Sequence, residues 1–339
     1  MLVTVVALII GLVLLVWSAD RFVIGASATA NILGISPLVI GILVVGIGTS
    51  APEMLVSAIA SSDGQAGLAV GNALGSNITN IALILGLTAL LIPLNVQSKL
   101  ISREIPLLII VMLAGYFLMR DGDLGVMDGT ILLFGFAAVI LRQLWEAKHS
   151  SGDSIEAEFE AEIPKDMGIK AALGWLLLGL ILLIGSARLL VWSAVDIAHF
   201  FGLSDLIIGL TVVAIGTSLP ELAASVAAAR KNEHDIAIGN VVGSNLFNLL
   251  GVMAIPGVLA PGPIDAAVMS RDYPVMLLLT GIFFLVARGP SKARRISRLE
   301  GGGLLCIYVA YIAYLAYDAG VFEHPSFRLE LVALSFRSR

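Results

Sequence analysis

Two glutamates stand inside long apolar stretches of this sequence, and each directly follows a proline. Glu53 ends the segment Gly48-Thr49-Ser50-Ala51-Pro52-Glu53, and Glu221 ends the segment Gly216-Thr217-Ser218-Leu219-Pro220-Glu221. A charged side chain at the centre of a membrane helix costs at least about 2.5–3.5 kcal/mol. A protonated or helix-paired glutamate would explain one such residue, but two copies of one pattern favour a functional role in binding cations.

The residues around each glutamate supply further oxygen atoms. On helical spacing, Thr49 lies one turn before Glu53, and Ser50 faces it. Pro52 lacks a backbone donor and clashes with the carbonyl one turn earlier, so it frees a carbonyl near Gly48. Free carbonyls at membrane depth are tolerated only where they line protein or a polar cavity. The second segment supplies the same set: Thr217, Ser218, Pro220 and Glu221.

A polar stripe with four-residue spacing follows each of these segments. The two stripes consist of the same residue types: Asn72, Ser76 and Asn80, then Asn240, Ser244 and Asn248. Interhelical hydrogen bonds would explain Asn77 or Asn245 alone, but a whole stripe beside a buried glutamate favours ion ligands. All of these ligands are oxygens, and no histidine or cysteine falls in the cluster, so the set favours Ca²⁺ or Na⁺ over zinc, copper or iron.

The composition indicates a polytopic membrane protein. Hydrophobic residues make up 58% of the chain and charged residues 13%, about half the charged fraction of a soluble domain. Apolar runs long enough to span a bilayer recur from end to end. No Lys or Arg precedes the apolar stretch that begins at Met1, so we expect a retained first helix rather than a signal peptide.

The polar motifs recur at one constant offset, which indicates an internal duplication. We expect an all-α fold of ten transmembrane helices, with proline-broken helices 2 and 7 at the ion site. Five spans in each half place the second half upside down relative to the first, as an inverted repeat. The expected spans are residues 2–24, 37–60, 66–92, 105–119, 130–145, 174–195, 206–229, 237–259, 274–287 and 304–316.

The boundaries and the orientation follow from the charges. We expect a first five-helix repeat at 1–145, an acidic cytoplasmic linker at 146–170, a second repeat at 171–318 and a polar tail at 319–339. With both termini outside, most Lys and Arg residues fall in cytoplasmic loops, as the positive-inside rule requires. The opposite loops before the tail hold only Arg120, Arg188 and Arg271. The compact loops suggest a prokaryotic inner or plasma membrane.

The paired Gly-Thr-Ser-x-Pro-Glu and Gly-Asn-x-x-Gly-Ser-Asn motifs resemble the two α-repeats of the prokaryotic-type sodium/calcium exchanger family, within the cation/Ca²⁺ antiporter superfamily. The resemblance covers residues 2–316, with the repeat motifs at 46–80 and 214–248. It implies an antiporter that exchanges Ca²⁺ for Na⁺ by alternating access, with helices 1 and 6 sliding as a gate. It also implies these ligands: Glu53, Glu221, Thr49, Ser50, Thr217, Ser218, Ser76, Ser244 and the carbonyls of Gly46 and Ala214.

One position departs from some family members, which carry an aspartate at the last motif position of one repeat. Here both residues are amides, Asn80 and Asn248, so the Na⁺:Ca²⁺ ratio stays open. Proton-coupled or K⁺-dependent cation antiport and a cation channel are the alternatives. We expect no enzyme, because no nucleophile–base pair or catalytic metal motif falls inside the spans. We also expect no cofactor, no nucleic acid and no obligatory protein partner; the partners are Ca²⁺, Na⁺ and the lipid bilayer.

Overall fold

The computed structural model describes residues 1–34, 47–96, 100–149, 167–232, 234–288 and 295–320. The first half is helical apart from two short strands. Its elements, in chain order, are α1 (Leu2–Ile32), α3 (Ile47–Thr49), α4 (Ala51–Ser62), α5 (Ala66–Thr79), the π-helix η2 (Asn80–Leu85), α6 (Gly86–Leu91), β1 (Leu94–Asn95), the π-helix η3 (Leu100–Glu104), α7 (Ile105–Met119), β2 (Asp123–Leu124) and α8 (Val126–His149).

The second half has nearly the same series of elements. They are α10 (Ile169–Phe201), α11 (Asp205–Ile208), the π-helix η4 (Gly209–Val213), α12 (Ala214–Thr217), α13 (Leu219–Arg230), α14 (His234–Phe247), the π-helix η5 (Asn248–Val252), α15 (Ala254–Leu259), β3 (Gly262–Pro263), the π-helix η6 (Val268–Asp272), α16 (Tyr273–Arg288), β4 (Arg295–Ile296) and α17 (Arg298–Asp318).

The offset between the motifs is also the offset between the elements. The π-helices η2 and η5 begin at Asn80 and Asn248, 168 residues apart, and α7 and α16 begin at Ile105 and Tyr273 with the same separation. A π-helix inserts one extra residue into a helical turn, a feature often found at functional sites. The duplication that the motifs indicate is therefore present in the backbone.

Capping residues mark the end or the beginning of several helices. Gly202 follows α10 with φ +66°, and glycine adopts this left-handed conformation without steric cost. Ser297 and Glu300 form a capping box at the start of α17, so two backbone donors there are satisfied by side chains.

The described part of the chain contains eight helices long and apolar enough to cross a membrane, and nine if the bent pair Asp205–Thr217 and Leu219–Arg230 is one span. These nine agree with nine of the ten expected spans. The remaining expected span, 37–60, begins among residues that lie outside the described ones. The fold is therefore that of an all-helical polytopic membrane protein.

Two of these spans occupy the centre of the bundle. In the most apolar windows of Ala66–Leu91 and His234–Leu259, 78% and 83% of the residues are buried, compared with 17–39% in the other six. The polar stripes lie on these two central spans. A cation bound there would be surrounded by protein rather than lipid.

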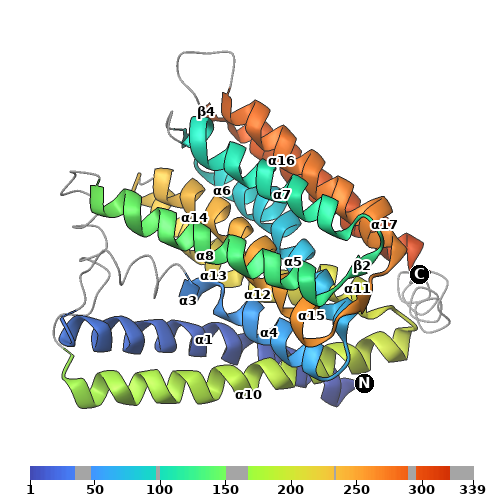
Figure 1. Ribbon diagram of the computed structural model, residues 1–339, viewed down its shortest axis with the longest axis horizontal. Coiled ribbons are helices and arrows are strands. Elements are labelled where there is room, and N and C mark those ends of the chain that lie inside the picture. Colours follow the sequence, from blue (N-terminus) through green and yellow to red (C-terminus); the bar gives the residue numbers. More distant parts are fainter. Residues whose placement is uncertain (35–46, 97–99, 150–166, 233, 289–294, 321–339) are drawn as a thin grey trace, which may run out of the picture.

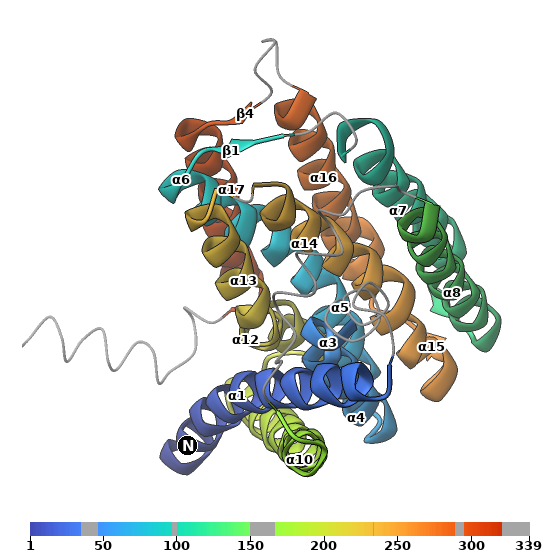
Figure 2. The ribbon, with the colours of Figure 1, turned by 90° about the vertical axis from the view of Figure 1, so that its left-hand side faces the viewer.

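The helices α1 and α10 lie side by side, apart from most of the bundle (Figures 1 and 2). They are antiparallel, because Gly11 of α1 packs against Leu190, whereas Gly25 packs against Leu176. Both helices share a small apolar cluster with α4 and the start of α5. The rest of the bundle has a separate, larger core.

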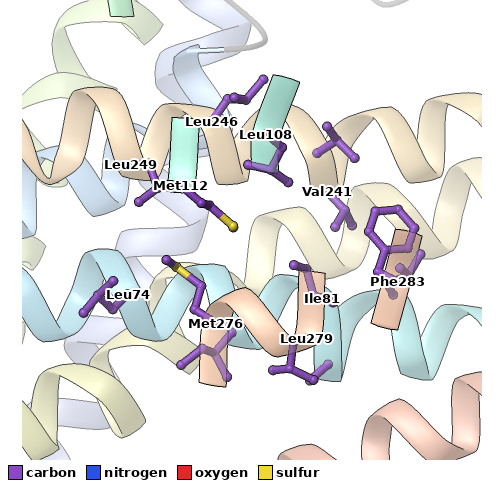
Figure 3. Close-up of a cluster of buried hydrophobic side chains, with 14 of the residues drawn as sticks. Leu74, Ile81, Leu108, Met112, Val241, Leu246, Leu249, Met276, Leu279 and Phe283 are labelled. Carbon is purple, nitrogen blue, oxygen red and sulfur yellow. The ribbon is translucent and has the colours of Figure 1, made fainter. Parts of the chain in front are cut away.

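Contacts between the two halves hold the larger core together. Figure 3 shows Met112 of α7 and Met276 of α16 among the leucines of α5, α14 and η5. Two short antiparallel ladders, β1 with β4 and β2 with β3, also join the two halves.

The helix α5 runs parallel to α11 and α12 of the other half, since Gly67 lies at Asp205 and Gly75 lies at Ala214.

Candidate cation-binding site

Helix breaks bring the two proline motifs into the centre of the molecule. The helical path is interrupted at Ser50 between α3 and α4, and at Ser218 between α12 and α13. The second break bends the chain by 43°. Pro52 and Pro220 occupy the first turns of α4 and α13, where a missing N–H removes no helical hydrogen bond. The expected proline-linked breaks are therefore present in the described residues.

Each break places its glutamate in the first turn of the following helix, inside the protein. Glu53 is 0% exposed and Glu221 is 1% exposed. The positive end of a helix dipole favours a negative charge at this position. The two carboxyl groups come from different halves, and the hydroxyl of Ser218, three residues before Glu221, lies 3.4 Å from Glu53 Oε1. Two negative charges at such a site repel one another. A cation between them would remove this repulsion.

Asn72 and Asn240 hold the backbone of the two glutamates in the same way. The Nδ2 atom of Asn72 donates to the carbonyl oxygen of Glu53 at 3.1 Å and to Ser57 Oγ at 3.1 Å. The Nδ2 atom of Asn240 donates to the carbonyl oxygen of Glu221 at 3.1 Å and to the hydroxyl of Ser225 at 3.0 Å. These amides anchor the broken helices, so the polar stripes are only partly available as ligands.

The two serines in these anchors were not predicted from the sequence. Ser57 and Ser225 each lie four residues after a glutamate, one helical turn on, and both are buried. Each also reaches a carbonyl of the facing helix, Ser57 to Ala69 at 3.5 Å and Ser225 to Ala237 at 3.4 Å. The recurrence of serine at this spacing in both halves was the signal that would have identified them.

Hydrogen bonds also cross between the halves at the site. Ser218 Oγ lies 3.4 Å from Glu53 Oε1, and Thr217 Oγ1 lies 3.2 Å from Asn72 Oδ1. Within the second half, the Ser244 hydroxyl donates to Glu221 Oε1 at 3.4 Å. Each carboxylate therefore has one oxygen that accepts a hydroxyl hydrogen bond.

Seven other side-chain oxygens at the site, all in described residues, have no hydrogen-bond partner. These buried oxygens are Glu53 Oε2, Glu221 Oε2, Ser50 Oγ, Ser76 Oγ, Asn77 Oδ1, Asn80 Oδ1 and Asn248 Oδ1. A buried polar atom without a partner is costly, so such a group of atoms requires an explanation. All seven are oxygens that can donate a lone pair, which is the ligand set of a hard cation.

An amide contact joins the two central spans, from Asn80 of the first polar stripe to Asn245, which lies next to Ser244 of the second. The Nδ2 atom of Asn80 donates to Asn245 Oδ1 at 3.0 Å, and Asn245 in turn lies 3.5 Å from the carbonyl of Asn77. Asn245 therefore makes the expected interhelical hydrogen bonds, and the Asn77 side chain makes a different one, from its Nδ2 atom to Met276 Sδ at 3.5 Å. The Nδ2 atom of Asn80 is engaged by the protein, which leaves its oxygen for a ligand.

Most of the predicted ligand residues are buried. Ser244 contacts Glu221 directly, and Ser50, Ser76, Asn80 and Asn248 are buried as well. The carbonyl of Ala214 already accepts from the Ser218 amide at 3.2 Å and the Thr217 hydroxyl at 3.4 Å. Thr49 is partly exposed and has an interaction of its own. The predicted carbonyl of Gly46 lies outside the described residues.

The composition of the site differs from that of a transition-metal site built from clustered His, Cys, Asp and Glu side chains. Within the ranges that the structure describes, no group of three or more His, Cys, Asp or Glu side chains is placed to hold a metal ion. In the described part of the site, two acids take part and the other side-chain oxygens are neutral. A hard cation bound here would be coordinated by two charged ligands and several neutral ones.

Comparison with protein families gives one match that spans nearly the whole chain. A family model described as sodium/calcium exchanger protein matches residues 3–145 and 171–317. The two matched segments coincide with the two halves of the fold. The unmatched segment between them contains the acidic stretch of the sequence.

Curated relatives are similar along almost their whole length. The putative antiporter CaxA of Alkalimonas amylolytica is 50% identical over 312 residues, which is 92% of this chain and 98% of CaxA. The inner membrane protein YrbG of Escherichia coli is 45% identical, with 90% and 95% covered. The sodium/calcium exchanger MaX1 of Methanosarcina acetivorans is 30% identical, with 91% and 97% covered.

Solved structures with the same arrangement are also known. The sodium-calcium exchanger NCX_Mj, soaked with 2.5 mM Na⁺ and 0.1 mM Ca²⁺, aligns with a TM-score of 0.62 and 32% sequence identity. The alignment covers 92% of this chain and 98% of that one.

Proposed function

Because this chain belongs to the sodium/calcium exchanger protein family of cation antiporters, we propose that it exchanges Ca²⁺ for Na⁺ across the membrane. The exchange uses one oxygen-lined site that both ions occupy in turn. The observation that supports this proposal most directly is the pair of buried carboxylates, Glu53 and Glu221, together with buried neutral oxygens that have no hydrogen-bond partner in the described residues.

The chemistry of this oxygen set supports both ions. Ca²⁺ takes six to eight oxygen ligands in flexible geometry, including carboxylates, carbonyls and amides. The ligands we propose are Glu53, Glu221, Thr49, Ser50, Thr217, Ser218, Ser76, Ser244, Asn80, Asn248 and the carbonyls of Gly46 and Ala214. Because both kinds of ion need the same two carboxylates, binding of one expels the other.

We further propose the architecture of two inverted five-helix repeats with ten membrane spans. The antiparallel packing of the equivalent helices α1 and α10 supports inversion, as does the parallel packing of α5 with α11 and α12. In an inverted repeat, substrate sites lie at the repeat interface near the bilayer midplane. The buried glutamates, one from each half, fit that location.

The domain boundaries and orientation remain part of the proposal. The repeats extend over 1–145 and 171–318, with a cytoplasmic linker at 146–170 and a tail at 319–339. Residues 150–166 and 321–339 lie outside the described ones. The distribution of Lys and Arg supports a topology with both termini outside, and similarity to an inner membrane protein of Escherichia coli supports a prokaryotic inner or plasma membrane.

The experiment that tests the function is ion flux in proteoliposomes. Purified protein is reconstituted with Na⁺ inside, and Ca²⁺ uptake is followed after dilution into Na⁺-free buffer at equal pH on both sides. We expect uptake that requires the Na⁺ gradient. Uptake that follows an imposed pH gradient and ignores Na⁺ would instead establish proton-coupled antiport, and single-channel currents in planar bilayers would establish a channel.

A further inference from the structure

We propose that the helix pair α1 and α10 binds the phosphate group of an anionic phospholipid, at a site where Arg21 lies between the indole rings of Trp17 and Trp175. The site uses none of the proposed ion ligands, and it does not depend on which ions are exchanged. The inference follows from the surroundings of Arg21, from its position on a lipid-exposed pair of helices and from the asymmetry between the two halves.

Two aromatic rings hold the guanidinium of Arg21. Its Cζ atom lies 5.5 Å from the ring centroid of Trp17 and 5.2 Å from that of Trp175. The two indoles contact each other edge to face, with 6.2 Å between their centroids. A cation within about 6 Å of a ring centroid is attracted by the negative face of the ring. Because Trp17 belongs to α1 and Trp175 to α10, the guanidinium is fixed at the seam between the two helices.

The positive charge of Arg21 lacks a close counter-ion among the described residues. Its Nε atom is buried without a hydrogen-bond partner. Asp20 Oδ2 lies 3.6 Å from that atom, and the Asp20 side chain is 60% exposed; this distance is too long for a hydrogen bond. The Arg21 side chain is itself 34% exposed, so a ligand can reach it. Arginine presents a planar fork of N–H donors that fits the oxygens of a phosphate in pairs.

The position of the cluster favours a lipid as the source of that phosphate. The helices α1 and α10 lie side by side at the edge of the bundle (Figure 2), and in their most apolar windows 28% and 33% of the residues are buried. Exposed apolar side chains on α1 extend from Leu2 to Trp17, and the next exposed residue is the charged Asp20. Tryptophan is enriched at the level of the lipid head groups, and arginine extends its charged end toward that level. Phospholipid phosphates lie at the same depth.

The internal duplication does not repeat this cluster. At the offset of 168 residues, its three members correspond to Gly185, Leu189 and Ala7, so the packing that is common to both halves does not require it. Toward the other end of the helix pair, the Thr4 hydroxyl donates to Asp196 Oδ2 at 2.6 Å. One end of the pair therefore presents a cation and the other an acid. In the proposed orientation the cation faces the cytoplasmic leaflet, whose anionic lipids attract basic residues.

The test measures lipid binding to the full chain in detergent, after native lipid has been removed. The chain has four tryptophans, so Trp145→Phe together with Trp192→Phe leaves the two of the cluster as fluorophores. In this background, phosphatidylglycerol with brominated acyl chains is titrated, and quenching of the tryptophan fluorescence reports its binding. We expect saturable quenching, and Arg21→Gln should weaken the apparent affinity at least about fivefold. Arg188→Gln is the matched control, because it removes the same charge from an exposed position of α10, and it should keep the affinity of the parent.

A second variant and two further ligands complete the test. Arg21→Lys keeps the charge but loses the planar fork, so its affinity should lie between those of the parent and Arg21→Gln. Unchanged affinity in either Arg21 variant, or an equal loss in Arg188→Gln, would overturn the proposal. Brominated phosphatidylcholine should quench more weakly, and equal quenching would show that an anionic head group is not selected. Displacement of the lipid by inorganic phosphate would show a site for free anions and would also overturn the proposal.

Discussion

Asn72 of the first half accepts a hydrogen bond from Thr217 of the second half, with 3.2 Å between the two oxygens. The same amide donates to the carbonyl of Glu53. A residue of one half, Thr217, therefore helps to hold the buried glutamate of the other half. Asn240 holds the carbonyl of Glu221 in the equivalent way, and no bond from the first half to its side-chain oxygen is among those observed in the described residues.

This asymmetry predicts different costs for two equivalent substitutions. Asn72→Ala removes three hydrogen bonds and leaves buried partners unsatisfied, whereas Asn240→Ala removes two. Each unsatisfied buried partner costs about 1–3 kcal/mol. We expect Asn72→Ala to lower the thermal unfolding temperature more than Asn240→Ala, measured in detergent by intrinsic fluorescence. Equal shifts, or a larger shift for Asn240→Ala, would contradict the assigned contacts.

The two carboxylates predict a loss of transport. Glu53→Gln or Glu221→Gln keeps the shape of the side chain but removes half of the site's charge. We expect Na⁺-driven Ca²⁺ uptake to fall at least about 100-fold, which corresponds to 2.7 kcal/mol of lost ion binding, with expression largely intact.

Glu300→Gln is the matched control for this pair, because Glu300 lies in the capping box of α17 and glutamine can also fill that position. We expect its uptake to stay near the wild-type rate. Uptake near that rate in both site variants would show that the ligand assignment is wrong.

The packing of α1 on α10 predicts a third effect. A Cβ atom at Gly179 would lie 2.5 Å from the backbone nitrogen of Phe22, whereas nothing lies within 4 Å of a Cβ at Gly185 in the same helix. Gly179→Ala should therefore separate the two helices, while Gly185→Ala should be neutral or stabilising by up to about 1 kcal/mol. Unfolding temperature and transport rate of the two variants provide the comparison. A tolerated Gly179→Ala with unchanged transport would contradict this close approach.

The buried ion pair in the second half predicts an effect on stability alone. Asp272 is fully buried and pairs with Arg271, whereas the second acid on Arg271, Asp318, has a side chain that is 48% exposed. Removing one partner of a buried pair costs about 3–5 kcal/mol, but an exposed pair contributes about 0–1 kcal/mol. We expect Asp272→Asn to lower the unfolding temperature markedly and Asp318→Asn to change it little. Comparable melting curves for the two variants would argue against the buried pair as a structural element.

Several features of the site were predictable because they depend on local chemistry. A proline followed by a glutamate in an apolar run indicates a broken helix with a buried charge, and both breaks are present at Ser50 and Ser218. Helical spacing also identified Ser76 and Asn80 on one face. The π-helices that begin at Asn80 and Asn248 were not predicted, because an α-helical period gives no signal for one extra residue in a turn.

The sequence by itself determined the class of protein, the two halves, nine of the observed spans and the two carboxylates, because hydrophobicity, spacing and repetition are properties of neighbouring residues. Only the tertiary structure decided which polar groups are used within the protein and which oxygens remain for an ion. The amide groups of Asn72 and Asn80 are engaged by Glu53 and Asn245, while the oxygens of Ser76 and Asn248 have no partner. Spacing along a helix fixes the face on which a side chain lies, but its hydrogen-bond partner belongs to another helix, and the packing of the two halves determines that choice.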